Sequence, residues 1–351
     1  MKYLYMLLVF VPMAVAAELM HASPLVIFAL SAAAIIPLSG ILGKATEELA
    51  GHTGSTVGGL INATLGNFAE LVIAALALRA GLIDLVKASI TGSILGNLLL
   101  VLGAAQLAGG LKYKSQSINR NLTGMSSTLL VVAVLGLVMP AVFYAAHPDP
   151  LRRATVNMSI WVAGFLILGY ALSLVFSMFT HRSSFAEAGG DVAHHETPPH
   201  WSLKKSIIVL AVAAATIGVL SEFLVGSTEE AVASLGLSQI FVGLILIPII
   251  GNAAEHSSAV LMAMKNRMDL AISISVGSAI QVALLIGPLL VLLGYMFGQP
   301  MDLAFTVMEV ASVAVAVAIA SSVMQDSESN WLEGAFLLVA YAVIGVAFYF
   351  Y

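Results

Sequence analysis

Two short motifs hold the side chains best suited to chemistry. They read Gly66-Asn67-Phe68-Ala69-Glu70 and Gly251-Asn252-Ala253-Ala254-Glu255, and the second follows the first by 185 residues. Both lie inside long apolar stretches, where a carboxylate is costly and is kept only where it is paired or used. Carboxylate, amide and backbone oxygens are hard ligands that suit Ca²⁺ better than Zn²⁺ or Cu²⁺. We therefore predict a divalent-cation site, with these candidate ligands: Gly66, Asn67, Glu70, Gly251, Asn252 and Glu255.

The two glutamates also predict competition between the cation and protons. Two ionised carboxylates balance the charge of one divalent cation, whereas without the cation they repel each other and lose hydration, which favours their protonated forms. Exchange follows if only the cation-loaded and proton-loaded forms can reorient. The alternative for either glutamate is a protonated side chain that makes a helix-packing hydrogen bond.

Further polar residues follow the two motifs at helical spacing. They are Ser93 and Asn97 in the first half of the chain, and Ser278 and Gln281 in the second half. We expect these side chains to support the cation site or a proton path. His256 adjoins Glu255 but faces another side of the helix, so we expect it to pack or support rather than bind. Each Gly-Asn pair is expected to kink or break its helix just before the carboxylate.

Other acidic residues have less specific signals. Asp84 and Asp269 fall at predicted helix starts, where a cap or an interaction with the helix dipole is expected. Glu309 has no partner in the repeat and is a candidate for a proton path only. Two Thr-Glu-Glu triplets are expected at helix ends, either as solvated ends or as an acidic vestibule for cations. Their acidic residues are Glu47, Glu48, Glu229 and Glu230.

The composition indicates a polytopic membrane protein. Of 351 residues, 60% are hydrophobic and only 9% are charged, far from the composition of soluble domains. The absence of Cys excludes disulfides and thiolate metal sites. The net charge of −5, without a basic stripe, disfavours nucleic-acid binding. We expect no cofactor, and we expect the lipid bilayer, Ca²⁺ and protons as partners.

Apolar stretches predict an all-α fold with about eleven transmembrane helices and no strands. Their approximate ranges are 3–20, 24–45, 56–79, 83–110, 121–146, 154–181, 204–227, 236–264, 268–298, 302–324 and 331–350. The first range also resembles a signal peptide with a cleavage region at Ala14-Val15-Ala16. Ten of the 14 Lys and Arg residues fall on the N-terminal side of this arrangement. The N-terminus is therefore expected in the cytoplasm and the C-terminus outside. The short loops, without large soluble domains, favour a plasma membrane.

The spacing of 185 residues extends beyond the glutamates and predicts an internal repeat. It also relates Gly58 to Gly243, Asp84 to Asp269 and Gly92-Ser93 to Gly277-Ser278. A five-helix repeat unit has an odd number of spans, so the two units are expected to be inverted in the membrane. The predicted organisation is an N-terminal helix (1–21), a first repeat (22–182), a cytoplasmic linker (183–202) and a second repeat (203–351). The linker holds His194, His195 and His200, and is either simply solvated or a weak metal or pH sensor.

The two motifs resemble those of the cation/proton exchangers (CAX) of the cation/Ca²⁺ antiporter superfamily. The resemblance rests on the two Gly-Asn-x-x-Glu motifs, with Gly92-Ser93-Ile94-Leu95-Gly96-Asn97 after the first and Gly277-Ser278-Ala279-Ile280-Gln281 after the second. The related Na⁺/Ca²⁺ exchangers look different, with Pro before the acidic residue. The resemblance implies H⁺-driven Ca²⁺ export, with Glu70 and Glu255 as carriers of both ions. It also implies a sliding pair formed by the second and seventh helices, and assembly as a homotrimer.

Three other functions stay open at this point. A Na⁺-coupled or Mn²⁺-selective exchanger would use the same kind of site. An intramembrane metalloenzyme built on Glu255 and His256 is disfavoured, because one Glu-His pair cannot complete a metal shell. A passive cation channel would explain the acidic residues but not an inverted repeat. We therefore expect a transporter rather than an enzyme.

Overall fold

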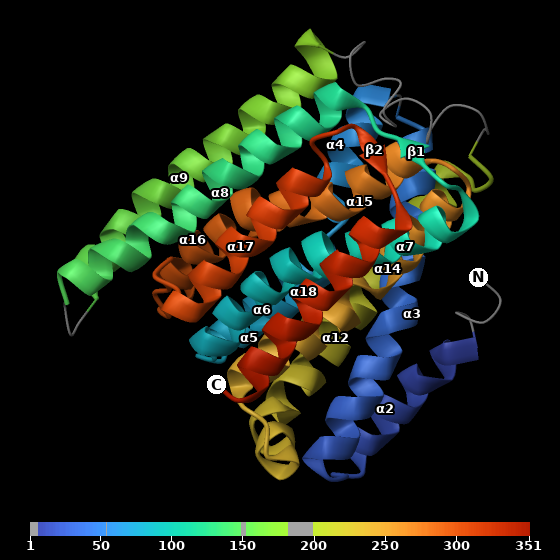
Figure 1. The fold of residues 1–351 in the computed structure, drawn as a ribbon. Helices are drawn as coiled ribbons and strands as arrows, with labels where there is room; N and C mark the ends of the chain where they lie inside the picture. Colours follow the sequence, from blue (N-terminus) through green and yellow to red (C-terminus); the bar gives the residue numbers. More distant parts are fainter. Residues whose placement is uncertain (1–5, 54, 149–151, 182–198) are drawn as a thin grey trace. The chain divides into compact units, whose positions relative to one another are not determined.

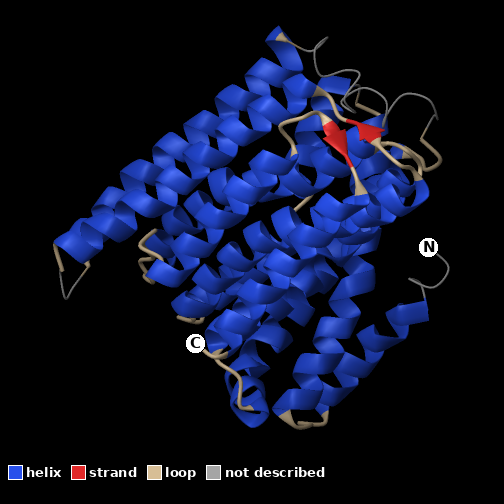
Figure 2. Ribbon diagram, viewed as in Figure 1, coloured by secondary structure: helices blue, strands red, loops and turns tan. Residues whose placement is uncertain are grey.

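The computed structural model describes residues 6–53, 55–148, 152–181 and 199–351, and these residues are almost entirely helical (Figures 1 and 2). Within these ranges, seven helices are long and apolar enough to cross a membrane, and a bent pair of helices would make an eighth. The prediction of an all-α polytopic membrane protein is confirmed. Helices occupy each of the eleven predicted ranges, although the number that cross the membrane stays a prediction. Most of the predicted linker, including His194 and His195, lies outside the described residues.

The helical elements, including short 3₁₀ (η1) and π (η2, η3, η5, η6) segments, follow in chain order. They are η1 (Leu7–Val9), α2 (Phe10–Leu19), α3 (Pro24–Gly51), α4 (Ser55–Leu65), α5 (Phe68–Arg79), α6 (Ile83–Leu95), η2 (Gly96–Val101), α7 (Leu102–Lys112), α8 (Arg120–Ala146), α9 (Arg153–Val175), η3 (Phe176–Thr180), α12 (Leu203–Leu235), α13 (Gln239–Phe241), η5 (Val242–Leu246), α14 (Ile247–Met264), α15 (Met268–Gln281), η6 (Val282–Ile286), α16 (Gly287–Phe297), α17 (Val307–Val323) and α18 (Trp331–Tyr349).

Several helix boundaries recur at the spacing of the sequence repeat. Helices α6 and α15 begin at Ile83 and Met268, and α5 and α14 end at Arg79 and Met264. Helices α7 and α16 correspond at both ends, and a π segment precedes each of them. Each of these pairs of boundaries is 185 residues apart. This recurrence supports the internal repeat, while the inverted orientation of its halves stays a prediction.

Two details of the predicted elements are wrong. The chain contains two short strands, β1 (Gln116–Ser117) and β2 (Glu328–Ser329), which pair antiparallel. The Thr-Glu-Glu triplets do not end their helices, because α3 continues to Gly51 and α12 to Leu235. The hydroxyls of Thr46 and Thr228 bond to carbonyls one turn earlier, at 2.9 and 2.6 Å, so neither side chain interrupts its helix. Helix α12 ends instead at Gly236, whose φ of 66° suits the left-handed position after a helix.

The contacts divide the chain into two compact units. Unit 1 consists of Met1–Ser89, Asp191–Glu255 and Tyr351, and unit 2 consists of Ile90–Gly190 and His256–Phe350. Each unit therefore combines segments from both halves of the sequence. These units are defined by contacts, whereas the predicted boundaries 22–182 and 203–351 are those of a sequence repeat. The repeat boundaries stay a prediction.

In unit 1, α3 packs along α12, and α2 and α5 pack against this pair. Two glycines related by the repeat allow close approaches there. A Cβ atom on Gly58 would meet the carbonyl oxygen of Ala50 at 2.7 Å, and one on Gly243 would meet the carbonyl oxygen of Leu85 at 2.8 Å. These positions exclude larger residues because protein backbones do not yield easily.

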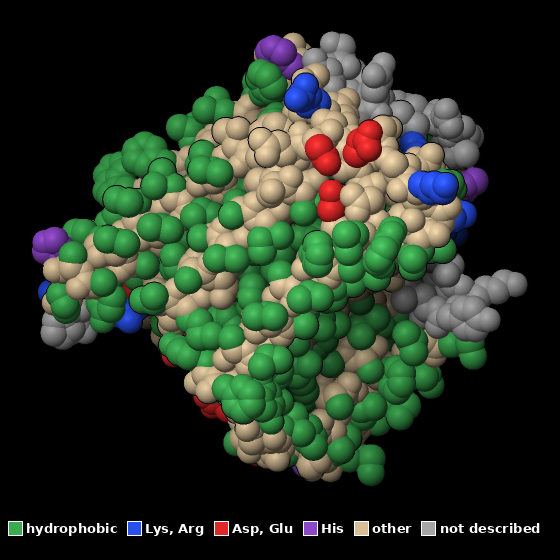
Figure 3. All heavy atoms as spheres, in the orientation of Figure 1, with side chains coloured by type: hydrophobic (Ala, Val, Ile, Leu, Met, Phe, Trp, Pro, Cys, Tyr) green, Lys and Arg blue, Asp and Glu red, His purple; other side chains and the backbone are tan. Residues whose placement is uncertain are grey.

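In unit 2, α18 packs on α7, α17 packs on α8, and α16 packs on α9. Hydrophobic side chains cover much of the visible face of α8, α9, α17 and α18 (Figure 3). Large apolar residues such as Trp161, Phe165 and Phe336 are mostly exposed there. A continuous apolar exterior of this kind is expected where helices face lipid.

Candidate cation-binding site

Glu70 lies at the start of a new helix. Helix α4 ends at Leu65, Gly66 and Asn67 form a turn, and α5 begins at Phe68. Asn67 has φ −96° and ψ 27°, outside the helical region, so the predicted break before this carboxylate is confirmed. Glu70 is in the first turn of α5, where the positive end of the helix dipole favours a carboxylate. Its side chain is only 9% exposed, and that of Asn67 only 2%.

The second motif also bends its helix before the carboxylate. Gly251 and Asn252 belong to α14, and the helix is bent at a break between Ala253 and Glu255. The predicted kink is therefore confirmed, two residues after Asn252. Pro248 lies inside the same helix, where it has no N–H to donate. Glu255 is partly buried, and its Oε2 atom is shielded from solvent.

The two motifs meet at the carboxylate of Glu70. The side-chain amide of Asn252 donates a hydrogen bond to Oε1 of Glu70. The backbone of Gly251 lies against the same side chain, and a Cβ atom there would be 2.8 Å from Cγ of Glu70. The structure therefore brings Glu70, Gly251 and Asn252 together within unit 1. The second motif supplies a donor that holds Glu70 and a residue small enough to admit it.

The other predicted polar residues belong to unit 2 and are buried. Ser93, Asn97, Ser278 and Gln281 are each less than a tenth exposed. Asn97 Nδ2 donates to Ser278 Oγ at 3.1 Å, so the corresponding helices α6–η2 and α15 are joined by the predicted polar faces. Asn97 Oδ1 is buried and has no hydrogen-bond partner among the described residues. An amide oxygen in this condition is chemically suited to accept a proton donor or a cation.

His256 gives no sign of a ligand role in the described part of the chain. Its ring is partly buried, and Nε2 is shielded from solvent with no hydrogen-bond partner among the described residues. No group of three or more His, Asp or Glu side chains gathers in a metal-like arrangement within the described ranges. The expected packing or supporting role of His256 stays a prediction.

The four acids of the predicted vestibule differ from one another. Glu47, Glu229 and Glu230 are exposed, as solvated or cation-attracting carboxylates would be. Glu48 is buried, and its Oε2 accepts the backbone N–H of Trp201 at 3.0 Å. Glu48 therefore anchors the chain just before α12 rather than facing solvent.

A set of contacts around Trp201, at the C-terminal end of the predicted linker, was not predicted from the sequence. Nε2 of His52 lies 2.7 Å from the carbonyl oxygen of Trp201, and the ammonium groups of Lys44 and Lys205 lie over its ring, 5.3 and 4.6 Å from the centroid. Lys44, Glu48 and His52 are four residues apart and so share one face of α3. This spacing in α3, together with a Trp just before the next helix, is the sequence signal that could have indicated these contacts.

Acidic residues outside the motifs make contacts that the sequence did not predict. Asp269 lies in the first turn of α15, as expected, and also accepts the backbone N–H of Asn119 at 2.7 Å. Glu309 lies in the first turn of α17, which begins at Val307, and forms a capping box with Thr306. The proton path stays a prediction. An ion pair between Arg152 and Asp302, 3.0 Å apart, was also missed.

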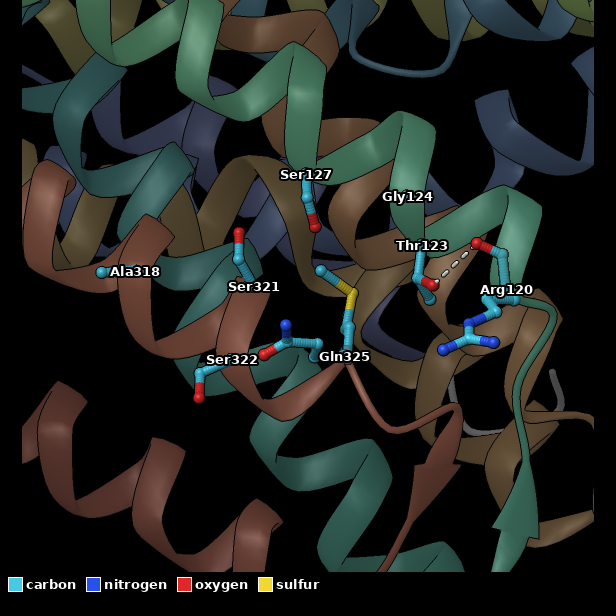
Figure 4. A pocket seen from close by; sticks show the side chains of 9 residues that line it. Arg120, Thr123, Gly124, Ser127, Ala318, Ser321, Ser322 and Gln325 are labelled. Carbon is cyan, nitrogen blue, oxygen red and sulfur yellow. Dashed lines mark hydrogen bonds between the residues drawn. The ribbon is translucent and has the colours of Figure 1, made fainter.

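A cavity of about 510 Å³ opens between α8 and α17 in unit 2 (Figure 4). Figure 4 shows the side chains of Ser127 and Ser321 between Ala318 at one end and Arg120 at the other. None of the predicted cation ligands lines this cavity. The cavity is therefore distinct from the site around Glu70.

Apolar helices long enough to cross a membrane and a buried carboxylate held at a helix break are features of membrane transport proteins. The sequence pattern of the sodium/calcium exchanger protein family matches residues 23–179 and 205–350, and the chain belongs to this family. The resemblance to cation/proton exchangers is also confirmed by the proteins described next.

Several relatives cover nearly the whole chain. A Ca²⁺/H⁺ antiporter of Aphanothece halophytica is 44% identical over 98% of this chain and 95% of its own length. The Ca²⁺/H⁺ antiporter ChaA of Bacillus subtilis is 40% identical over 97% of this chain and 96% of its own length. The crystal structure of the Ca²⁺/H⁺ antiporter protein YfkE matches with a TM-score of 0.86 and 37% identity, covering 100% of both chains. An H⁺/Ca²⁺ exchanger CAX, only 14% identical, shares the fold with a TM-score of 0.78 over 99% of this chain and 92% of its own.

Proposed function

We propose that this protein exports Ca²⁺ from the cytoplasm in exchange for H⁺ by alternating access. In this proposal, Glu70 and Glu255 bind Ca²⁺ or protons competitively near the middle of the membrane. The observation that carries it is the buried carboxylate of Glu70, held at a helix start by Asn252 of the second motif. The relatives named above support the choice of Ca²⁺ and H⁺.

The burial of the Glu70 carboxylate favours a site that holds either Ca²⁺ or a proton. An ionised carboxylate in a buried place must be compensated by donors, by a cation or by a proton. The amide of Asn252 and the N-terminus of α5 supply part of this compensation. Ca²⁺ or a proton supplies the rest, so that loss of one ligand favours binding of the other.

The membrane arrangement is part of the same proposal. The recurring helix boundaries and the two matched segments of the family pattern support two related halves. An odd number of spans in each half inverts them, so that movement of one against the other exposes the site to alternate sides. The distribution of Lys and Arg supports a cytoplasmic N-terminus and an external C-terminus. A plasma-membrane location is part of the same proposal. Assembly as a homotrimer also belongs to the proposal.

Transport by the purified protein tests this function. Proteoliposomes are given a pH gradient, and Ca²⁺ uptake is measured without Na⁺ and then with Na⁺. Uphill Ca²⁺ movement without Na⁺ is expected, together with its loss in Glu70→Gln. Glu328→Gln, which changes an exposed acid in β2, is the matched control and should transport normally. Uptake that requires Na⁺, or no uptake by the wild type, would overturn the proposal.

A further inference from the structure

Helix α17 begins with a capping box that uses only one oxygen of Glu309. The backbone N–H and the hydroxyl of Thr306 both donate to Oε2 of Glu309, at 2.9 and 2.8 Å. The backbone N–H of Glu309 donates in return to the hydroxyl of Thr306 at 3.3 Å. This reciprocal arrangement satisfies the helix start, and Gln serves the same position in other capping boxes. The cap therefore leaves Oε1 available for another contact.

That second oxygen reaches a different helix. The hydroxyl of Thr91, in α6, donates to Oε1 of Glu309 at 3.3 Å, across 218 positions of sequence. Thr91 is 1% exposed and Glu309 is 3% exposed, so water does not compete for this bond. Glu309 therefore joins the start of α17 to α6 inside unit 2.

The segment of α6 held in this way leads directly to two buried polar residues of unit 2 that the sequence predicts to support transport. Thr91 precedes Ser93 by two residues, and Asn97 follows in η2. Helix α17 also packs against η2, so it supports this segment at two places. Asn97 Nδ2 donates to Ser278. The direction of the buried Oδ1 of Asn97 therefore depends on the position of α6 and η2. A small rotation of α6 would redirect that oxygen.

We propose that Glu309 is a positioning residue for transport, which sets the orientation of Asn97 by holding Thr91. The inference rests on the proposed exchange of Ca²⁺ and protons. Glu309 does not touch the transported ion in this proposal. Its cap function fixes α17, and its second oxygen transmits that fixed position to α6.

Four variants separate the link from the cap. Thr91→Val removes the bond to Oε1 and leaves the capping box intact. Thr306→Val removes the cap hydroxyl and leaves the bond to Thr91. Glu309→Ala removes both interactions, whereas Glu309→Gln keeps a side chain that can make both. Each is compared with the wild type for maximal Ca²⁺ uptake, for half-saturating Ca²⁺ and for thermal stability.

Thr91→Val and Glu309→Ala are expected to raise the half-saturating Ca²⁺ concentration by about 10-fold, the range typical of residues that orient metal ligands. Maximal uptake should change by less than about 2-fold, since the glutamates are intact. Glu309→Gln should restore near-normal half-saturation. Thr306→Val should lower the melting temperature with little change in half-saturation. The double variant of Thr91→Val with Glu309→Ala should be no worse than Glu309→Ala, because both remove one link.

The proposal is overturned if Thr91→Val has wild-type half-saturation, or if Thr306→Val raises it as much as Glu309→Ala does. If Glu309→Ala does not fold, Thr91→Val still decides. Stabilisation of the detergent-solubilised protein by Ca²⁺ gives a binding readout that does not depend on transport. Wild-type protein that Ca²⁺ stabilises but that shows no pH-driven uptake would refute the proposed function, whereas normal uptake with an unaffected Thr91→Val would refute only the positioning role.

Discussion

The two copies of the Gly-Asn-x-x-Glu motif differ in structure despite their matched sequences. At the first copy the helix stops and restarts, and Glu70 is buried in the first turn of α5. At the second copy α14 is bent rather than interrupted, and Glu255 is only partly buried. The first motif presents a carboxylate, while the second presents an amide and bare backbone to it. Two related sequences therefore have different roles in this structure.

Replacing either carboxylate by its amide should have the largest effect and tests whether both copies are needed. Glu70→Gln and Glu255→Gln should each reduce exchange by at least about 100-fold, because half of the compensating charge for a buried divalent ion is lost. Ca²⁺ uptake under a pH gradient measures this, with insertion and melting temperature compared with the wild type. Substantial uptake by both variants would refute the two-glutamate site.

Removing the amide that holds Glu70 should have a smaller effect. Asn252→Ala should reduce Ca²⁺ affinity by about 10- to 100-fold, the equivalent of one hydrogen bond to a charged group. Asn62→Ala, at an exposed position of α4, is the matched control and should bind normally. Ca²⁺-dependent thermal stabilisation measures both variants. Equal affinities would mean that the contact between the motifs does not support the site.

Filling the space beside Glu70 tests the bare backbone of the second copy. A Cβ atom in Gly251→Ala would lie 2.8 Å from Cγ of Glu70 and would displace the carboxylate. Overpacking of this kind costs about 1–3 kcal/mol, which corresponds to roughly 10-fold weaker Ca²⁺ binding. Gly218→Ala in α12 is the control, since a Cβ atom there would have no neighbour within 4 Å. A normal Gly251→Ala variant would show that Glu70 has room to move.

The acidic triplets extend the comparison to the C-terminal parts of α3 and α12 and should give the smallest effects. Glu48→Ala should lower the free energy of unfolding by about 1–3 kcal/mol, because it leaves the N–H of Trp201 without its acceptor. The pair Glu229→Gln and Glu230→Gln should leave stability unchanged and raise half-saturating Ca²⁺ by about 2-fold at low salt. Melting temperatures and uptake at two salt concentrations distinguish these outcomes. Equal effects of the two changes on stability would contradict the difference in burial.

The apolar periodicity and the duplicated motif were sufficient to predict the helices and the place where they break. Helices occupy each predicted range because a chain in lipid must make its backbone hydrogen bonds within itself. The turn at Gly66 and Asn67 could be predicted because Gly and Asn weaken a helix and because Glu70, just after them, needs a partner. These features depend on local sequence alone.

Features that depend on distant segments could not be predicted in the same way. The capping box of Glu309 required the start of α17 to be known within a few residues, and apolar composition placed it five residues too early. The bond from Thr91 to Glu309, the bond from Trp201 to Glu48 and the strand pair β1–β2 each join residues more than 150 positions apart. No periodic pattern marks such partners, because each contact is specified by packing of the whole unit.

The interleaving of the two units has a consequence for synthesis of the protein in the cell. Helix α3 packs against α12, and Glu70 is held by Asn252, so the first third of the chain needs residues made much later. When a ribosome has finished α9, neither unit is complete, because each unit also contains residues from the second half. Before the second half is made, polar residues such as Glu48 and Glu70 therefore lack the partners that they have in the complete protein. Each unit can therefore be completed only after residues of the second half have been made.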